Sequence, residues 1–130
     1  MTTAPARVCP EVTAPLSADT DGDGCPEALR WADGIVEAGG GRWSVGRPGD
    51  LVVTGDWACR GMSTLALLRP GTGDVFVFDG WASPGQDVAA TARARVDGAF
   101  ALRPSDLDAD GCPELLVERT GGPPVRVPRP

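Results

Sequence analysis

The sequence predicts an all-β protein made of three four-stranded antiparallel units. Short apolar segments recur along the chain between Gly, Pro and Asp residues, which is typical of strands separated by turns. The 18 glycines and 13 prolines among 130 residues agree with a chain of many turns. A nine-residue acidic motif also occurs in three versions, which begin at Asp19, Asp56 and Asp106. Their spacings of 37 and 50 residues lie in the range of repeated structural units such as propeller blades.

The first unit is expected at about residues 19–55, after a disordered lead of residues 1–5, with residues 6–130 forming a single repeat domain. Residues 19–27 form an acidic loop. Four short strands are then expected at residues 28–31, 34–37, 42–45 and 51–54, each ended by Gly, Asp or Pro.

The second unit is expected at about residues 56–105, again with a loop followed by four strands. These strands are predicted at residues 65–68, 74–78, 91–96 and 100–102. Val75 and Val77 alternate with Phe76 and Phe78. Because successive side chains point to opposite faces, this strand is predicted to be buried on both sides.

The third unit, residues 106–130, contains only two expected strands, at residues 115–117 and 125–127. Residues 6–18 supply two further short segments, and Ala6-Arg7-Val8 repeats Ala94-Arg95-Val96. We therefore expect the N-terminal strands to complete the C-terminal unit, which would remove exposed edges. Two assemblies fit this pattern, a small pseudo-threefold monomer and a homodimer of six units that exchanges termini.

Two acidic loops carry carboxylates at positions 1, 3, 5 and 9 and glycine at position 6. Alternate carboxylates in a tight loop point to one centre, which suits a hard cation, and Ca²⁺ accepts such a shell more readily than Mg²⁺. The expected ligands, with the backbone carbonyl of cysteine at position 7, are Asp19, Asp21, Asp23, Cys25 and Glu27 in the first loop, and Asp106, Asp108, Asp110, Cys112 and Glu114 in the second. The alternative is a pair of acidic surface turns without an ion.

Neither loop is an EF-hand, because that motif needs glutamate at position 12 and a flanking helix. Position 12 is Arg30 in the first loop and Val117 in the second. The version that begins at Asp56 keeps that acid at position 1 but has lost the other three, with Ala58, Arg60 and Thr64 at positions 3, 5 and 9. No ion is expected there, and Arg60 is expected either to pair with Asp56 or to point into solvent.

The cysteines at 9, 25, 59 and 112 form no C-x-x-C pair, so a zinc site is not expected. An even number in a small, turn-rich chain favours two disulfides and an oxidising, extracytoplasmic compartment. The pairing Cys9–Cys25 and Cys59–Cys112 is favoured, since Cys59 and Cys112 lie in corresponding loops. Four buried thiols in a cytoplasmic protein are the alternative. No signal peptide or stretch long enough to span a membrane is recognisable, so the chain is expected to be either cytoplasmic or an excised exported domain.

The composition argues against several functions. The net charge of −6 disfavours nucleic acid, which needs a basic face. The chain has no histidine, so Ser-His-Asp catalysis is excluded. A carboxylate pair such as Asp79 and Asp87 could serve a glycoside hydrolase, but nothing around them singles them out, and we expect no enzyme.

Tryptophan is the best candidate for a recognition surface, because it offers a flat apolar face with one hydrogen-bond donor. Trp57, next to the middle loop, and Trp81, at the start of a long connection, are preferred over Trp31 and Trp43. For each tryptophan the alternative is packing in the core or between units.

The chain resembles the FG-GAP repeats of integrin-alpha-type β-propellers, including the bacterial extracytoplasmic versions. The resemblance is carried by residues 19–27 and 106–114, by Gly55-Asp56-Trp57, and by residues 65–70 with Thr72-Gly73. It implies propeller-like blades whose loops join strands and bind Ca²⁺ through positions 1, 3, 5, 7 and 9. The Phe-Gly and Gly-Ala-Pro signatures are missing, position 9 is Glu rather than Asp, and three blades are fewer than a typical ring.

This resemblance implies a non-catalytic, calcium-binding, extracytoplasmic interaction or scaffold module. Its partner would be a protein or a cell-surface glycan. Several propellers with related repeats act as lectins, so sugar binding through an exposed tryptophan is the second expectation.

Overall fold

The computed structural model describes residues 9, 11–12, 16–21, 24–38, 41–82, 90–107 and 111–127. These residues form twelve strands and no helix, and every strand pair is antiparallel. The prediction of an all-β chain is therefore confirmed. Within the same residues, no helix has the length and apolar character needed to cross a membrane.

The strands are short and follow one another closely. In chain order they are β1 (Ser17–Ala18), β2 (Glu27–Ala28), β3 (Arg30–Ala32), β4 (Ile35–Ala38), β5 (Gly41–Ser44), β6 (Leu51–Gly55), β7 (Thr64–Arg69), β8 (Asp74–Phe78), β9 (Ala90–Arg95), β10 (Ala99–Ser105), β11 (Glu114–Arg119) and β12 (Val125–Val127).

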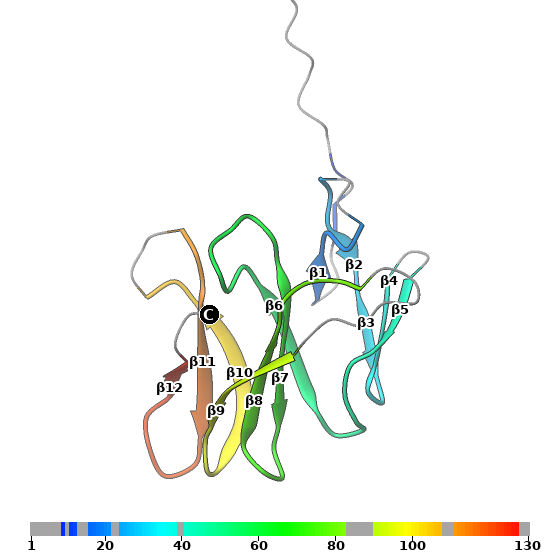
Figure 1. Ribbon diagram of the computed structural model, residues 1–130. Coiled ribbons are helices and arrows are strands. Elements are labelled where there is room, and N and C mark those ends of the chain that lie inside the picture. Colours follow the sequence, from blue (N-terminus) through cyan, green and yellow to red (C-terminus); the bar gives the residue numbers. More distant parts are fainter. Residues whose placement is uncertain are drawn as a thin grey trace, which may run out of the picture.

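Three sheets stand side by side, each with its strands in sequence order (Figure 1). The N-terminal sheet is β3-β4-β5, the middle sheet is β6-β7-β8-β9, and the C-terminal sheet is β10-β11-β12. The small β1-β2 pair leads into the N-terminal sheet, because only Leu29 separates β2 from β3 and its N–H donates to the Leu16 carbonyl at 3.0 Å. Sequence-adjacent pairing of this kind follows from the short connections between strands.

The loops of the acidic motif lie inside the sheets rather than between them, which corrects the expected grouping of strands. β6 pairs with β7 and β10 with β11, so each loop joins the first two strands of a sheet. The predicted units had instead assigned β6 and β10 to the sheet before the loop. The described residues of all three loops lie at the same edge of the molecule, at the top of Figure 1, with the tight turns that follow β3, β7 and β11 at the opposite edge.

The N-terminal segment is placed differently from the expectation as well. Ser17 and Ala18 pair with Ala28 and Glu27 in β2, rather than with the C-terminal sheet. The remainder of the expected closing segment, residues 6–8, 10 and 13–15, lies outside the described residues.

The middle sheet separates two apolar clusters, and its strand β7 is buried on both faces. Leu65 packs with Val36 and Leu29 of the N-terminal side, whereas Ala66 and Leu68 pack against the C-terminal sheet. β8 alternates in the same way, since Val75 and Val77 belong to the C-terminal cluster and Phe78 contacts the N-terminal one. The predicted two-sided burial of this strand is confirmed in part, because Val75 and Val77 are buried whereas Phe76 and Phe78 are half-buried. Apolar contacts on both of its faces make this sheet the centre of the fold.

The two outward faces of the stack are polar. On the N-terminal sheet, Glu37 stands opposite Arg30 and Arg42, with Arg42 Nε 3.8 Å from Glu37 Oε1. On the C-terminal sheet, Arg103 Nε lies 3.2 Å from Glu118 Oε1. Charged cross-strand pairs of this type are typical of faces exposed to water.

Candidate metal centre

The two acidic loops share one hydrogen-bonding plan, and the middle loop keeps part of it. In the first acidic loop (residues 19–27), the Gly24 N–H at position 6 donates to Asp19 Oδ2 at position 1, over 2.9 Å. The Thr20 N–H at position 2 donates to Glu27 Oε2 at position 9, over 2.7 Å. These two bonds close the loop and turn the carboxylates at its ends inward.

The second acidic loop (residues 106–114) repeats the plan almost atom for atom. The Gly111 N–H donates to Asp106 Oδ2 over 3.0 Å, and the Leu107 N–H donates to Glu114 Oε2 over 2.7 Å. The middle loop (residues 56–64) keeps the first bond, from the Gly61 N–H to Asp56 Oδ2 over 2.8 Å. The sequence repeat is therefore also a structural repeat.

Glycine at position 6 is required by the backbone. Gly24, Gly61 and Gly111 have φ angles of +88°, +82° and +85°, a left-handed region that residues with a side chain rarely adopt. The turn at this position sends the chain back so that position 9 meets position 2.

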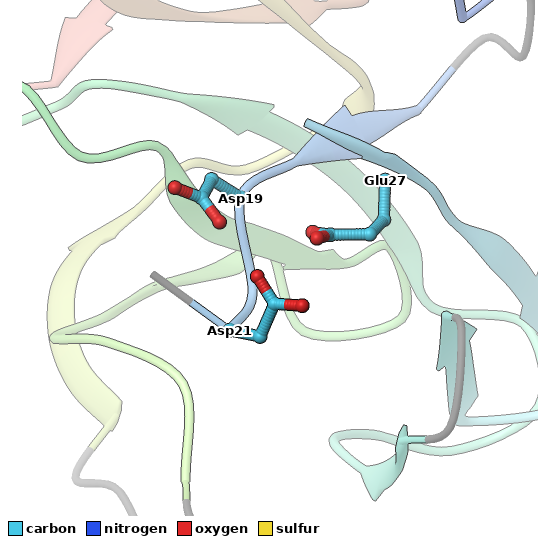
Figure 2. Close-up of side chains that lie close together, drawn as sticks. All are labelled: Asp19, Asp21 and Glu27. Atoms are coloured by element: carbon cyan, nitrogen blue, oxygen red, sulfur yellow. The ribbon is translucent and has the colours of Figure 1, made fainter. Parts of the chain in front are cut away.

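Asp19, Asp21 and Glu27 form an acidic cluster in the first loop. Each offers one carboxylate oxygen, and these oxygens lie within 4.8 Å of one another. Figure 2 shows the Glu27 side chain reaching from its strand back toward Asp19 and Asp21. Asp21 is exposed and the other two are half-buried, so a cation can reach the cluster from solvent.

The donor set fits a hard divalent cation. Carboxylate oxygens are the ligands that Ca²⁺ prefers, and three carboxylates this close repel one another unless a positive charge or protons intervene. Asp23, the other expected side-chain ligand of the first loop, lies outside the described residues. Cys25, whose carbonyl was expected to complete the shell, is 5% exposed and belongs to the same loop.

The second acidic loop differs from the first at its last ligand. Glu114 is 4% exposed, whereas Glu27 is half-buried, and Arg126 Nη2 lies 3.5 Å from Glu114 Oε1. The guanidinium therefore provides part of the positive charge that a cation would supply. Asp106 and Cys112 lie in the loop as predicted, and Asp108 and Asp110 lie outside the described residues.

In the middle loop, Asp56 is held by two backbone N–H groups, those of Arg60 and Gly61. Asp56 Oδ1 accepts a hydrogen bond from the Arg60 N–H over 3.0 Å. The Arg60 contact with Asp56 is thus made by its backbone, and the Arg60 residue itself is exposed. Thr64, at position 9, is buried and begins β7.

Both disulfides have the pairing that the sequence favoured. Cys9 is bonded to Cys25, and Cys59 to Cys112. Each acidic loop therefore has a disulfide at position 7, and the second disulfide ties the middle loop to the second acidic loop. Two disulfides in a small chain indicate an oxidising, extracytoplasmic compartment.

All four tryptophans donate their indole N–H to a backbone carbonyl. The acceptors are Asp50 for Trp31, Ala82 for Trp43, Thr64 for Trp57 and Ser63 for Trp81, at 3.0 to 3.1 Å. Trp57 is only 3% exposed and lies in the cluster between the middle and C-terminal sheets. It is therefore a core residue and cannot form the recognition surface proposed for it.

Trp81 is half-buried and lines a groove between the first acidic loop and the middle loop. The groove measures about 540 Å³ and is lined by Asp19 and Thr20 on one side and by Met62 and Ser63 on the other. The Trp81 ring stands edge-on to Trp43, with centroids 5.2 Å apart. Sequence reasoning identified Trp81 but not the groove, because the groove depends on how two loops far apart in sequence lie together.

The carboxylate pair considered for a hydrolase is described only in part. Asp79 is exposed and lines a small hollow with Trp57 and Arg60, and Asp87 lies outside the described residues.

Comparison of the chain with known protein families, curated proteins and solved structures finds no match.

Proposed function

We propose that the chain is a non-catalytic, calcium-binding module of an extracytoplasmic protein, which serves to bind or position a protein partner. The observation that supports this is the convergence of Asp19, Asp21 and Glu27 in a loop whose hydrogen bonds recur in full in the second acidic loop and in part in the middle loop. Two acidic loops keep all four carboxylates, whereas the middle loop keeps only Asp56.

In this proposal the chain's own residues hold the ion and gain stiffness from it. Asp19, Asp21 and Glu27 supply carboxylate oxygens, with Asp23 and the Cys25 carbonyl completing the shell. The bound Ca²⁺ supplies positive charge that offsets the repulsion among the carboxylates. The loop then presents a fixed surface at the edge of the sheets, as a binding module needs.

The sheets are proposed to be blades of a propeller-like arrangement. The first strands of successive sheets are neighbours, since β1 contacts β6 and β10 contacts β6 and β7. A loop between the first two strands of each sheet, and first strands that line up around a common side, are what FG-GAP-like repeats imply. The three loops would then form one face of the module.

Thermal unfolding with Ca²⁺ and with EDTA tests this function. A ligand at about 100 times its Kd stabilises a protein by about 2.7 kcal/mol, which for a chain of this size raises Tm by roughly 10 °C. We expect such a rise with Ca²⁺, a smaller one with Mg²⁺, and loss of most of it in Asp21→Asn. Asp97→Asn, which removes an exposed acid from a turn outside the loops, is the control and should keep the rise.

An unchanged Tm across these conditions, together with no binding by calorimetry, would reject the calcium proposal. The role as a binding module would then rest on the groove alone.

A second candidate function is lectin-like binding of a cell-wall or surface glycan, favoured by the groove at Trp81. Its volume is in the range of small-ligand sites, and it combines an aromatic side chain with carboxylate and hydroxyl groups, which suits a sugar ring. The hydrogen bond to Ser63 and the contact with Trp43 fix the indole in place. A glycan array, followed by titration of a hit against Trp81→Ala and Met62→Ala, tests it; binding unchanged in both variants, or no hit, contradicts it.

A further inference from the structure

The outer edge of β12 lacks the strand that the middle sheet has at the same place. In the middle sheet, β8 pairs with β7 on one side and with β9 on the other. In the C-terminal sheet, β12 pairs with β11, and no strand among the described residues pairs with its other edge. The N–H and C=O groups along such an edge form a template for one more strand.

The loop repeat fixes which residues correspond in the two sheets. Thr64 and Glu114 both stand at position 9, and they begin β7 and β11. Two residues further into each sheet, Ala66 faces Val77 and Leu116 faces Arg126. Arg126 in β12 therefore corresponds to Val77 in β8, and the partner of Val77 in β9 is Thr91.

The chain contains a second copy of the β9 sequence at its N-terminus. Residues 2–8 are Thr-Thr-Ala-Pro-Ala-Arg-Val, and residues 90–96 are Ala-Thr-Ala-Arg-Ala-Arg-Val, with five of the seven positions identical. Thr3 matches Thr91 in this alignment. Pro5 replaces Arg93, and proline is tolerated in an outermost strand, where one edge needs no partner.

The position of Cys9 prevents residues 2–8 from pairing along the whole of β12 of their own chain in this alignment. Cys9 is bonded to Cys25 in the first acidic loop, which joins β1 and β2, and the flanking Ala18 and Leu29 pack in the apolar cluster on the N-terminal side of the middle sheet. Sheets pack about 10 Å apart, so the C-terminal sheet stands two spacings, or about 20 Å, away. Adjacent Cα atoms are about 3.8 Å apart, and Val8 therefore stays close to the first loop.

We propose that residues 2–8 of one copy of this chain add to β12 of a second copy as its outermost strand, with Thr3 opposite Arg126. Backbone hydrogen bonds along β12 would hold the copies together, and the added strand would lie beside β12 in the sheet, as β9 lies beside β8. The outward faces of both end sheets carry charged pairs, Arg42 with Glu37 and Arg103 with Glu118. Association is therefore expected through strand addition rather than through packing of apolar faces.

Two single variants, Thr3→Cys and Arg126→Cys, test the contact when they are purified separately and mixed under mild oxidation. Residues directly opposite on paired strands have Cβ atoms about 4.5–5.5 Å apart, close enough for a disulfide after a small shift. We expect a covalent heterodimer whose peptide link between residues 3 and 126 is found by mass spectrometry. The control mixes Thr3→Cys with Arg42→Cys, whose cysteine would lie at an exposed position of β5. It should give at least tenfold less covalent heterodimer.

Equal crosslinking to both sites, or none, would overturn the proposal, and so would an intrachain link in the Thr3→Cys/Arg126→Cys double variant. Deletion of residues 2–8 provides a second measurement that does not depend on cysteine chemistry. Sedimentation should show concentration-dependent dimers for the full chain and monomers for the deletion, with thermal unfolding showing that both are folded. A full chain that stays monomeric at all concentrations overturns the proposal.

Discussion

Arg69 donates hydrogen bonds from two nitrogens of its guanidinium group to the carboxylate of Asp50. Nε lies 3.1 Å from Oδ1 and Nη2 lies 2.9 Å from Oδ2, and Asp50 is only 4% exposed. The same aspartate accepts the Arg47 N–H, and its carbonyl accepts the Trp31 indole. One buried ion pair thus fixes the connection between the N-terminal and middle sheets.

Asp50→Ala should destabilise the protein by about 3 kcal/mol, because breaking a buried pair leaves an uncompensated charge and loses the turn contact with Arg47. Urea unfolding at neutral pH measures it. Asp74→Ala removes a comparable pair with Arg95, 2.8 Å apart, in which the arginine side chain is 68% exposed. That control should cost less than about 1 kcal/mol, and an equal loss in both variants would contradict the role given to Asp50.

Acid should weaken the fold partly through Asp50. Burial alone would raise the pKa of Asp50, but the hydrogen bonds from Arg69 and from the Arg47 N–H, with the attraction of both guanidinium groups, outweigh it and leave the pKa below its ordinary value. A depressed pKa adds stability above the ordinary value of about 4, and this stability is lost as the pH falls through the folded-state pKa.

As the pH falls below about 4, the free energy of unfolding should decrease more steeply in the wild type than in Asp50→Asn, which carries no charge at this position. Urea unfolding over a pH series in EDTA measures the difference, because other carboxylates titrate alike in both proteins. Parallel curves would show that Asp50 does not contribute to the acid sensitivity.

Arg126→Ala should strengthen calcium binding at the second acidic loop. The guanidinium lies 3.5 Å from a Glu114 oxygen, so it repels a cation and competes for that ligand. Removing a charge at such a site is worth about 1 kcal/mol near a protein surface, or roughly a fivefold lower Kd for the weaker of two sites in calorimetry.

Arg103→Ala is the matched control for this variant, since Arg103 lies on the same sheet and pairs with Glu118 rather than with a loop residue. Its two calcium affinities should stay as in the wild type. Weaker binding in Arg126→Ala would mean that the arginine orients Glu114 for the ion instead of competing with it.

Local patterns were enough to place the strands but not to group them. The strands expected at residues 51–54 and 74–78 correspond to β6 and β8, because apolar alternation and the Gly and Pro residues that end a strand are local in sequence. Whether β6 joins the sheet before or after its loop depends on pairing with β7, which a single strand does not encode. Each predicted unit was taken to begin with its loop. The strand before each loop was therefore assigned to the preceding sheet instead of to the sheet in which it pairs.

The acidic loops were predictable because their chemistry is contiguous in the chain. Asp19, Asp21 and Glu27 converge as their spacing indicated, and the favoured cysteine pairing is confirmed. The contacts of Arg126 with Glu114 and of Arg69 with Asp50 were missed, because each depends on the register of neighbouring strands. Trp57 was wrongly predicted to be exposed for a related reason. Its indole packs between the middle and C-terminal sheets, and this contact depends on residues far apart in sequence.

Gly73→Ala should be among the most damaging small changes in the chain. Gly73 has φ of +77°, and a Cβ there would lie 2.2 Å from the Val96 carbonyl oxygen, next to the bond from the Val96 N–H to the Gly73 carbonyl at 2.9 Å. Strain and this clash should cost more than about 2 kcal/mol in urea unfolding. Gly71→Ala, in the same turn, meets nothing within 4 Å and should stay within about 0.5 kcal/mol of the wild type. Similar losses in both would mean that the turn itself, rather than the approach to Val96, limits stability.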